Sequence, residues 1–593
     1  MAYPPAYQVE VYRGILELRM LSEEKNNKEA ATPTVSREMV DLTEDEPDGS
    51  AGSRVAGDTE ENPYMIEDDG DDVEKVLIVD RDIKLQDVGF CSWNVQLRDD
   101  SFMRITSLGV VNNRLICMYG RRLVLPNNDI KSEMVISEEG GELLWLTQLD
   151  AQGRERGLEV RRGPQEINSF CNILFTNLPE SVIREYLNNS NGDYFFCRYR
   201  RAVSAGVRED SGRLNRQKSG ILQVISPEEA DDVEITLGPW PSLRAKACEI
   251  REAFRGRRQI GPARANPNSY VFADFFSGAG GASQGAVDAG LSPLFALDHD
   301  CPAVKTYAEN FARYGTMIFN MGVTEFLRLS NSYTSETGRP TLIDIAHMSP
   351  PCQPFSPANT TPNQMMNELN EATFITVRDL LEAFKPRMVT LEETDGLLNN
   401  KHMMWFRWLL KTFKILGYSV VWRSVEMVNY GVAQSRTRLI LIAAGPGESL
   451  PPFPEPTHDG PGLKPRPSIY GAIGNITLPP DQHLGPVNDF PARKRPLPWN
   501  GLAGTVTTNG GSNNYHPDGW RKYTVTELAA LQTFPPTFQL HGRAVTRWRK
   551  QIGNAVPPAF SHVLFKSIKE WLWNADQAEI GGAAVARAEG SRL

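Results

Sequence analysis

One cysteine of this sequence lies in a setting unlike that of the others. Cys352 follows the apolar run IDIAHMS and lies among prolines in the segment 350–354, PPCQP. Prolines restrict the backbone around the thiol, and a thiolate on a loop after a strand is a candidate nucleophile for covalent catalysis. The other six cysteines are scattered singly without a CxxC pair. This spacing favours core thiols in a reducing compartment over disulfides or a zinc ribbon.

A glycine-rich turn indicates a nucleoside ligand. The apolar run 271–276 ends in SGAGG, where glycine lets the backbone approach a ligand closely, and a helix is expected next. A second strand, 293–297, ends in Asp298 and His299. The acid is placed to accept hydrogen bonds from ribose hydroxyls, and the flat ring suits contact with adenine. These features predict a nucleoside cofactor in a doubly wound α/β domain, although a structural turn explains an isolated FSGAGG equally well.

These motifs belong to a longer ordered series. The series consists of DFFSGAGG, LDHD, SPPCQPFS, LEET, QSRTR, TVTELAALQTFP and QIGNAVPP, in that order. In these motifs and their order, residues of about 270–570 resemble the cytosine-C5 DNA methyltransferases. The resemblance implies a Rossmann-like, S-adenosylmethionine-dependent methyltransferase domain over 269–575. The implied reaction is methyl transfer to C5 of cytosine in DNA.

The resemblance gives each polar residue a chemical role. Cytosine C5 is too electron-poor to attack a methyl sulfonium directly, but addition of the Cys352 thiolate to C6 makes C5 carbanion-like. Glu392 would protonate N3 if burial raises its pKa. Gln434, Arg436 and Arg438 alternate along an expected strand and so share one face. In the family, the matching arginines contact the cytosine carbonyl and the phosphate and orient the nucleophile. The chemistry requires the target base of double-stranded DNA to flip out of the stack.

S-adenosylmethionine is the cofactor that the resemblance implies, and no metal is expected. QIGNAVPP lies far enough along the chain to fit a terminal helix that returns to the cofactor, with a plain loop turn as the alternative. The implied cofactor residues are Phe276, Ser277, Gly278, Gly280, Asp298, His299 and Gly322, with Asn554 and Val556 closing the site.

Three motifs depart from the family pattern. Glu393 and Thr394 follow Glu392 where the family has Glu-Asn-Val, so an amide that normally buttresses the active site is missing. Gly322 stands where an aspartate contacts the adenine amine, and the segment 526–532 lacks both arginines of the usual RExxRLQ. The acidic motif and the large N-terminal extension resemble the fungal RID/Masc-type branch, which is associated with premeiotic methylation or silencing of repeated DNA.

The N-terminal half has a different texture. Short β-type runs separated by turn residues over 76–240 predict an all-β module. The stretches MYGRRLVLP, FTNLP and YFFCRYR resemble a bromo-adjacent homology (BAH) domain, which implies contact with chromatin or histones. A β-barrel that only packs on its neighbour is the alternative. A basic linker over 241–268 follows, with Arg255, Arg257 and Arg258 as candidates for nuclear import or phosphate contact.

The expected target-recognition region, at about 440–505, is short. It contains the basic triplet 493–495, RKR, which can contact phosphates without specifying bases. Trp499 and Trp520 are either wedges for DNA or buried aromatics. Low sequence specificity is therefore expected.

Charge is unevenly distributed along the chain. Residues 22–75 hold 18 acidic against 5 basic residues, a balance of −13. Since the whole chain carries −10, the remainder carries −10 + 13 = +3. Residues 1–75 are expected to form a short docking or dimerisation helix and an acidic disordered tail, and 576–593 a second tail. Val40–Thr43 with its acidic flank resembles a SUMO-interacting motif. No apolar run is long enough for a membrane helix.

The leading hypothesis is a nuclear DNA (cytosine-5)-methyltransferase whose substrate is DNA. It is expected to act in silencing and to be able to form a homodimer. The alternative from another class is a catalytically weak or inactive methyltransferase fold that binds DNA or chromatin as a silencing factor. Glu393 and Gly322 favour that alternative, while the intact Cys352 and Glu392 oppose it. A tRNA methyltransferase shares these motifs, but the N-terminal module and acidic tail make it less favoured.

Overall fold

The computed structural model divides the chain into two compact units. The first comprises Met1–Arg121 with Glu159–Cys171, and the second comprises Arg122–Leu158 with Asn172–Leu593. The residues that the structure describes are 81–84, 93–111, 114–125, 142–150, 155–157, 159–189, 194–204, 219–231, 244–255, 270–337, 343–351, 355, 364–476, 490, 492–509 and 514–590.

The first unit is built from antiparallel strands. β3 pairs with β1 and β2, β2 pairs with β8, and β4 pairs with β7. Strands therefore form where the sequence predicts them, and buried Val95, Phe102 and Met103 contribute to their core. The elements are β1 (Arg81–Lys84), β2 (Trp93–Leu97), β3 (Phe102–Val111), β4 (Arg114–Val124), β7 (Glu159–Arg162), η2 (Pro164–Glu166) and β8 (Ile167–Phe170). The short strand β6 (Glu155–Gly157) belongs to the second unit, where it pairs with β5 (Glu142–Leu149).

The second unit contains a mixed sheet in the order β14-β13-β12-β15-β16-β18-β17. Its first five strands are parallel, and β18 lies antiparallel between β16 and β17. β12 comes first in the sequence among these strands but lies inside the sheet. The chain therefore winds outward from it in both directions, as predicted. The strands are β12 (Val271–Phe275), β13 (Ser292–Asp298), β14 (Met317–Asn320), β15 (Ile345–Met348), β16 (Met388–Thr394), β17 (Ser419–Glu426) and β18 (Thr437–Ala444).

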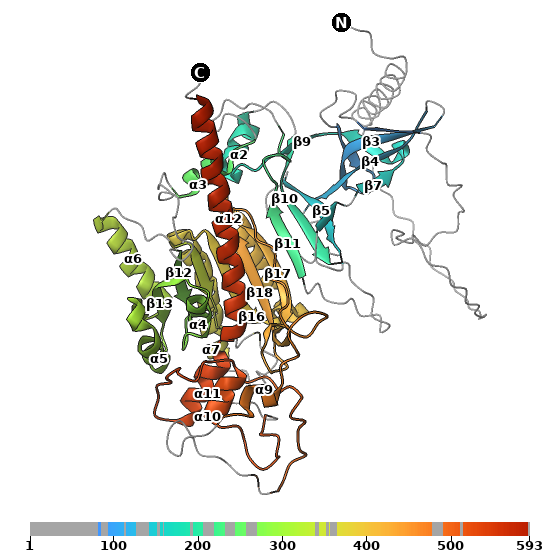
Figure 1. The fold of residues 1–593 in the computed structure, drawn as a ribbon. Coiled ribbons are helices and arrows are strands. Elements are labelled where there is room, and N and C mark those ends of the chain that lie inside the picture. The colour runs from blue at the N-terminus through green and yellow to red at the C-terminus, as the bar shows by residue number, and fades with distance from the viewer. Residues whose placement is uncertain are drawn as a thin grey trace, which may run out of the picture. The chain divides into compact units, whose positions relative to one another are not determined.

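Helices cover both faces of this sheet (Figure 1). One apolar cluster joins Phe275, Leu297 and Leu391 to α6, α7 and α8, and another joins Phe272 and Ile440 to α4 and α12. Alternate residues of each strand therefore belong to two separate apolar layers. The helices are α4 (Gly281–Asp288), α5 (Cys301–Phe311), α6 (Val323–Thr337), α7 (Gln364–Phe384), α8 (Met403–Ile415), α9 (Ile469–Ile473), α10 (Val525–Leu531), α11 (Val545–Asn554) and α12 (Pro558–Gly590).

The sheet continues beyond β17 into strands from the N-terminal half. β11 (Ser219–Val224) pairs antiparallel with β17, and β10 (Tyr194–Ser204) pairs with β11, β5 (Glu142–Leu149) and β9 (Asn172–Phe175). The expected boundary of one separate domain over 76–240 is therefore wrong. The reason is packing, because Gly220 leaves room for the fully buried indole of Trp422, and a β-carbon there would lie 2.2 Å from it.

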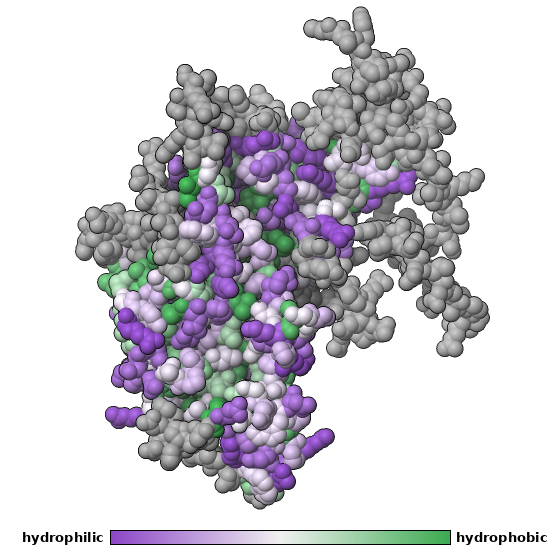
Figure 2. Space-filling model, viewed as in Figure 1, coloured by the Kyte–Doolittle hydropathy of each residue, from purple (hydrophilic) through white to green (hydrophobic). Residues whose placement is uncertain are grey.

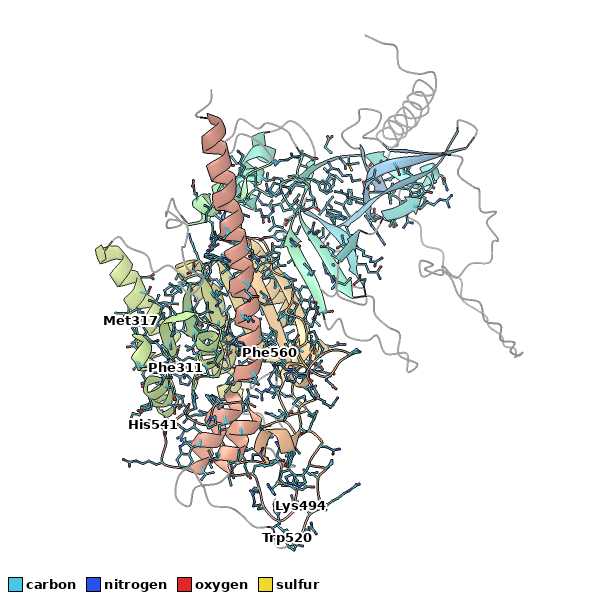
Figure 3. All side chains as sticks on the ribbon, viewed as in Figure 1. Phe311, Met317, Lys494, Trp520, His541 and Phe560 are labelled. Atoms are coloured by element: carbon cyan, nitrogen blue, oxygen red, sulfur yellow. The ribbon has the colours of Figure 1, made fainter. Side chains whose placement is uncertain are left out.

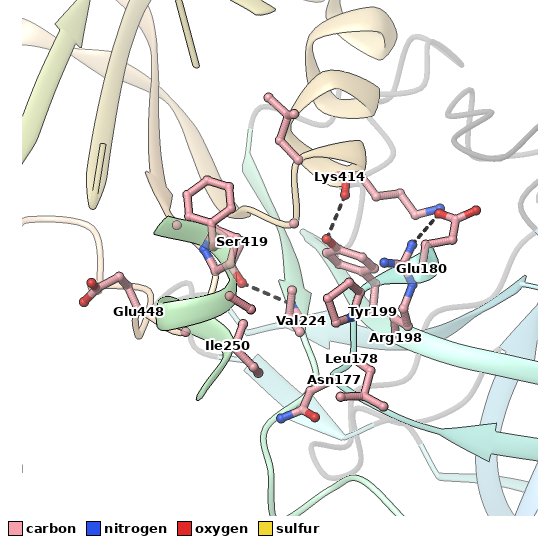
Figure 4. A pocket seen from close by; sticks show the side chains of 18 of the residues that line it. Asn177, Leu178, Glu180, Arg198, Tyr199, Val224, Ile250, Lys414, Ser419 and Glu448 are labelled. Carbon is pink, nitrogen blue, oxygen red and sulfur yellow. Dashed lines mark hydrogen bonds and ion pairs between the residues drawn. The ribbon is translucent and has the colours of Figure 1, made fainter. Parts of the chain in front are cut away.

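A buried ion cluster joins these strands to α8. The Arg198 Nε donates to Glu142 Oε1 at 3.0 Å, Lys414 pairs with the other carboxylate oxygen, and the Tyr199 hydroxyl donates to the Lys414 carbonyl at 3.0 Å. Burial alone would raise the pKa of the Glu142 carboxyl, but Arg198 and Lys414 together hold it below its usual range. A cavity of about 1190 Å³ opens beside the cluster, between α2 (Glu180–Asn189), α3 (Ala247–Arg255) and the end of α8 (Figure 4).

The C-terminal helix corrects two further predictions. Residues 576–590 belong to α12 rather than to a disordered tail, because Asp576 accepts hydrogen bonds from the Tyr270 hydroxyl at 2.8 Å and from the buried Arg387. The expected basic linker contains α3, in which buried Arg251 donates to Glu579 of α12 at 2.7 Å. Among the described residues, no helix is long and apolar enough to cross a membrane.

Replacement of Glu142 by Gln should destabilise the fold, because two buried cations then lose their shared carboxylate. We expect a loss of about 3–5 kcal/mol in the free energy of unfolding near neutral pH, measured by denaturant titration. The folded pKa of Glu142 is lowered, so its stabilisation is present above the unfolded pKa and is lost as the pH falls through the folded value. The difference between wild type and E142Q should therefore shrink in acid.

The matched control for E142Q is Glu382→Gln, which removes an exposed carboxylate from an i,i+4 pair with Arg378. An exposed pair contributes about 0.2–0.5 kcal/mol, so this variant should unfold almost like the wild type. Equal effects of the two substitutions would contradict a special role for the buried cluster.

Candidate active site

The predicted site residues lie mainly at one edge of the sheet. Carboxyl ends of parallel strands meet at the same edge, and a crevice forms where neighbouring connections leave in opposite directions. β12 is followed by the turn at 276–280, β13 ends at Asp298, β15 leads to Pro351, and β16 ends in Glu392–Thr394. Cys352 lies outside the described residues, so its placement here remains a prediction.

The turn after β12 has an unusual backbone. Phe276, Gly278 and Gly280 have positive φ angles of 61°, 54° and 95°. A β-carbon on Gly280 would lie 2.4 Å from a ring carbon of Phe311, whereas one on Gly278 would point into open space. The Ser277 amide donates to the Leu297 carbonyl at 3.0 Å. Gly280 therefore serves packing, while Gly278 leaves its backbone open to a ligand.

Asp298 fixes this turn to the end of β13. Its Oδ2 accepts from the Gly278 amide at 2.8 Å, and its Oδ1 accepts from the Asp300 amide at 2.8 Å. Each carboxylate oxygen keeps a second lone pair for an incoming hydroxyl. The neighbouring His299 side chain is 77% exposed, so its ring is accessible beside the carboxylate.

Three further predicted cofactor residues follow, one before α6 and two after the core of α11. Gly322 precedes α6, and a β-carbon there would meet no atom within 4 Å, so its surroundings are open. At the far end of the chain, Asn554 is exposed at the end of α11 and Val556 is buried. A β-carbon on Gly281 would lie only 2.4 Å from the Val556 carbonyl oxygen. The segment 551–558 therefore returns to the first glycine turn.

Gln434 and Arg436 are internal braces and not part of a common face with Arg438. β18 begins only at Thr437, so both residues precede the strand. Gln434 donates to the Leu531 carbonyl and accepts from the Val506 amide, at 2.7 and 2.9 Å. The buried Arg436 guanidinium binds the carbonyl oxygens of Val506, Gly553 and Ala555. The expected shared strand face is wrong for these two residues, of which Arg436 instead holds the returning 551–558 segment and Gln434 joins the chain at 506 to α10.

Arg438 faces the predicted acid. Its Nε lies 2.9 Å from Glu392 Oε1, and both side chains are mostly buried. Arg438 lies opposite Thr394 in the β16–β18 register, so it shares a face of the sheet with Glu392. This pair can present a carboxyl group and a cation side by side to a polar heterocycle.

Glu393 occupies the other face of the same strand end. Its side chain is completely buried, and its Oε2 accepts from the Thr394 amide at 2.9 Å. Its Oε1 has no hydrogen-bond partner among the residues described. Burial, reinforced by the charge of Glu392, raises the pKa of Glu393 well above its ordinary value.

The first residues of the predicted target-recognition region overlap a strand of the sheet. Residues 440–444 belong to β18, and α9 lies within the predicted region. Its aromatic side chains are accessible, since Trp499 is 39% and Trp520 51% exposed. Lys494 and Trp520 lie in the loops at the end of the molecule that carries α9 and α10, where hydrophilic residues gather (Figures 2 and 3).

Sequence reasoning missed a local replacement for the absent arginines of the 526–532 motif. Arg521 binds both carboxylate oxygens of Glu527 at 2.7 Å. Glu527 also completes a capping box with Thr524 at the start of α10. The signal was the WRKYT stretch just before the motif, which places a guanidinium six residues before the acid.

Comparisons with known proteins agree on one family. The model of the C-5 cytosine-specific DNA methylases matches residues 270–484 and 492–570. DNA (cytosine-5)-methyltransferase 1 of Gallus gallus is 32% identical over 192 residues, covering 31% of this chain and 12% of the relative. Type II methyltransferase M1.HphI of Haemophilus parahaemolyticus is 24% identical over 329 residues, covering 51% of this chain and 87% of the relative. The chain thus spans about an eighth of the chicken relative's length.

Among solved structures, the Dnmt2 methyltransferase of S. pombe matches with a TM-score of 0.38 and 14% identity. The match covers 51% of this chain and 98% of that one.

Replacement of Arg436 by Gln should loosen the 551–558 segment, because buried carbonyl oxygens lose their donor. We expect a loss of about 2–3 kcal/mol in unfolding free energy, with faster hydrogen exchange at 553–557. Arg438→Gln, which removes a partly exposed cation, is the control and should leave that exchange unchanged. Equal exchange in both variants would contradict the brace assigned to Arg436.

Proposed function

Because residues 270–570 belong to the C-5 cytosine-specific DNA methylase family, we propose that this chain is a DNA (cytosine-5)-methyltransferase using S-adenosylmethionine. The observation that carries the proposal is the Glu392–Arg438 pair at 2.9 Å, on the strand next to the one that leads to Cys352. A carboxyl group and a guanidinium at this edge match the two polar sides of a cytosine ring.

The residues present fit the cofactor. Gly278 leaves open space at its β-carbon position, and Asp298 keeps lone pairs for ribose hydroxyls. Phe276, Ser277 and Gly280 shape the turn, His299 offers an exposed ring, Gly322 borders open space, and Asn554 and Val556 lie on the returning segment. When bound, S-adenosylmethionine supplies an electrophilic methyl group.

The chain's own residues then prepare the base. The Cys352 thiolate adds to cytosine C6, while Glu392 holds a proton at N3 and Arg438 binds the carbonyl oxygen. Electron density gathers at C5, which takes the methyl group. Loss of the C5 proton and cleavage of the bond between sulfur and C6 restore the aromatic ring and the free thiolate. Gln434 and Arg436 support this chemistry by holding the chain that borders it.

Double-stranded DNA with a flipped cytosine is the proposed substrate, since the reacting atoms are inaccessible in a stacked duplex. The basic triplet 493–495 and the exposed rings of Trp499 and Trp520 support a DNA-facing role for the target-recognition region. Arg493 already lies over Trp520, with 5.8 Å between the guanidinium carbon and the ring centroid. Phosphate contacts of this kind position DNA without reading sequence, which supports low specificity.

The finer biological role rests on motifs. The Glu-Glu-Thr sequence at 392–394 and the N-terminal extension support a RID/Masc-type enzyme that silences repeated DNA in the nucleus. The strands of the N-terminal half support a BAH-like module that contacts histones or chromatin. Val40–Thr43 and the segment 1–21, which lie outside the described residues, are proposed for SUMO binding and homodimerisation.

A second candidate is a silencing factor with the same fold that binds DNA or chromatin but is catalytically weak or inactive. Gly322 and Glu393, at positions where the family has other side chains, favour it. Covalent trapping distinguishes the two candidates.

Duplex DNA containing 5-fluorocytosine should form a stable covalent complex with the protein in the presence of S-adenosylmethionine. Fluorine at C5 blocks the final elimination, so the adduct accumulates as a shifted band in denaturing electrophoresis. Cys352→Ala should abolish the band. Absence of the band in the wild type, despite measured DNA and cofactor binding, would favour the silencing factor, and a matched RNA competitor tests the tRNA alternative.

Gly322→Asp should strengthen cofactor binding, because the site has room for a side chain and lacks the carboxylate that bonds the adenine amine. One added hydrogen bond corresponds to about 0.5–1.5 kcal/mol, so the dissociation constant in calorimetry should fall about two- to tenfold. Gly322→Ala, which fills space without adding an acceptor, is the control and should not reproduce the gain. An unchanged or weakened affinity of the aspartate variant would place the adenine elsewhere.

A further inference from the structure

Two carboxyl groups, those of Glu392 and Glu393, lie at the end of β16 beside the guanidinium of Arg438. Glu392 and Glu393 are consecutive, so their side chains point to opposite faces of the sheet. Arg438 shares the face of Glu392 and pairs with it at 2.9 Å. On the other face, Glu393 lies opposite the apolar Leu439 in the strand register. Arg438 is therefore placed to pair with Glu392 and not with Glu393.

Glu393 lies in the apolar layer beneath the site. Its strand neighbours on that face, Leu391 and Leu439, belong to the cluster that also contains Phe355. The charged groups that act on Glu393 are Glu392 on its own strand and Arg438 on β18. On adjoining elements, His347 of β15 is bonded to Thr390 and Ser349, and Asp395 after β16 is bonded to Ser424.

An ionised carboxylate is costly in these surroundings. Glu393 is completely buried, one oxygen has a single backbone donor, and the other has no partner among the described residues. A buried charge needs a paired counter-ion and several hydrogen bonds, whereas Glu393 forms one hydrogen bond and no ion pair among the described residues. A neutral carboxyl group instead offers one acceptor oxygen and one hydroxyl donor, as a carboxamide offers one acceptor and one donor group.

We propose that Glu393 is a positioning residue that works only as a neutral acid. In that form it stays in the apolar layer and leaves Arg438 to pair with Glu392 alone. Ionisation would add a second negative charge beside Glu392 and draw Arg438 or water toward Glu393. The consequence for methyl transfer rests on the proposed function, whereas the protonation state itself does not.

The first test is thermal unfolding of the wild type and Glu393→Gln across pH. A raised folded pKa means that the wild type loses stability relative to the neutral amide as the pH rises from the unfolded pKa through the folded one. The melting temperature of E393Q minus that of the wild type should therefore increase from about pH 5 to about pH 9. A flat difference, or one that moves in favour of the wild type, would overturn the proposal.

Glu426→Gln is the matched control, because this exposed carboxyl group lies at the end of neighbouring β17. Its difference from the wild type should stay flat over the same range. Infrared difference spectroscopy gives a second readout that does not depend on the stability of the variant. The wild type should show a protonated-carboxyl carbonyl band that E393Q lacks, and identical spectra would contradict the assignment.

The activity test follows from the same state. Above the folded pKa of Glu393 the neutral fraction falls about tenfold per pH unit, so wild-type turnover should decline with it, whereas E393Q should lack that decline. Glu393→Asp, which stays ionisable but retracts the carboxyl group, should keep the decline and lose turnover. Parallel alkaline profiles of wild type and E393Q would overturn the positioning role. Absence of methyl transfer in every variant, with the expected unfolding and infrared results, would instead reject the proposed function.

Discussion

The proposed chemistry depends on the shared carboxyl edge of a parallel sheet. The central strands β15 and β16 are buried on both faces, so their side chains do not reach solvent before the strand ends. Polar groups therefore gather where β12, β13, β15 and β16 stop, and the winding direction changes between β12 and β15. This constraint explains why Gly278 of the glycine turn and Glu392, which are 114 positions apart in the sequence, lie at one edge of the sheet.

The extension of this sheet makes several strands of the N-terminal half part of the same structural unit as the methylase domain. β11 covers the edge of β17, and the Glu142–Arg198–Lys414 cluster joins β5 and β10 to α8. A buried ion cluster is a poor source of net stability but a strong constraint on which groups must meet. The strands β5, β9, β10 and β11 therefore belong to the structural frame of the methylase domain.

Sequence reasoning predicted the α/β class and the strand ends, because local motifs and apolar periodicity encode them, whereas the pairing of Glu392 with Arg438 came only from the structure. It failed where the determinant is a distant contact. The β11–β17 pairing joins residues about 200 positions apart, and the helical state of 576–590 depends on Asp576 meeting Arg387. Gln434 and Arg436 have the family spacing, but only the structure shows that they bind backbone carbonyl oxygens. The role of Cys352 remains a prediction.

The departures from the family pattern are better explained as substitutions within a working site than as decay. An unpaired charge at this buried position would destabilise the strand. Glu393 instead keeps one oxygen hydrogen-bonded and fits the apolar layer as a neutral acid. Near α10, the Arg521 guanidinium binds Glu527 with two hydrogen bonds where the motif itself lacks arginine. Gly322 differs, because the open space beside it contains no described replacement for a carboxylate. The Glu392–Arg438 pair is therefore in place at the proposed site, and the proposed adenine contact is where side chains offer the least support.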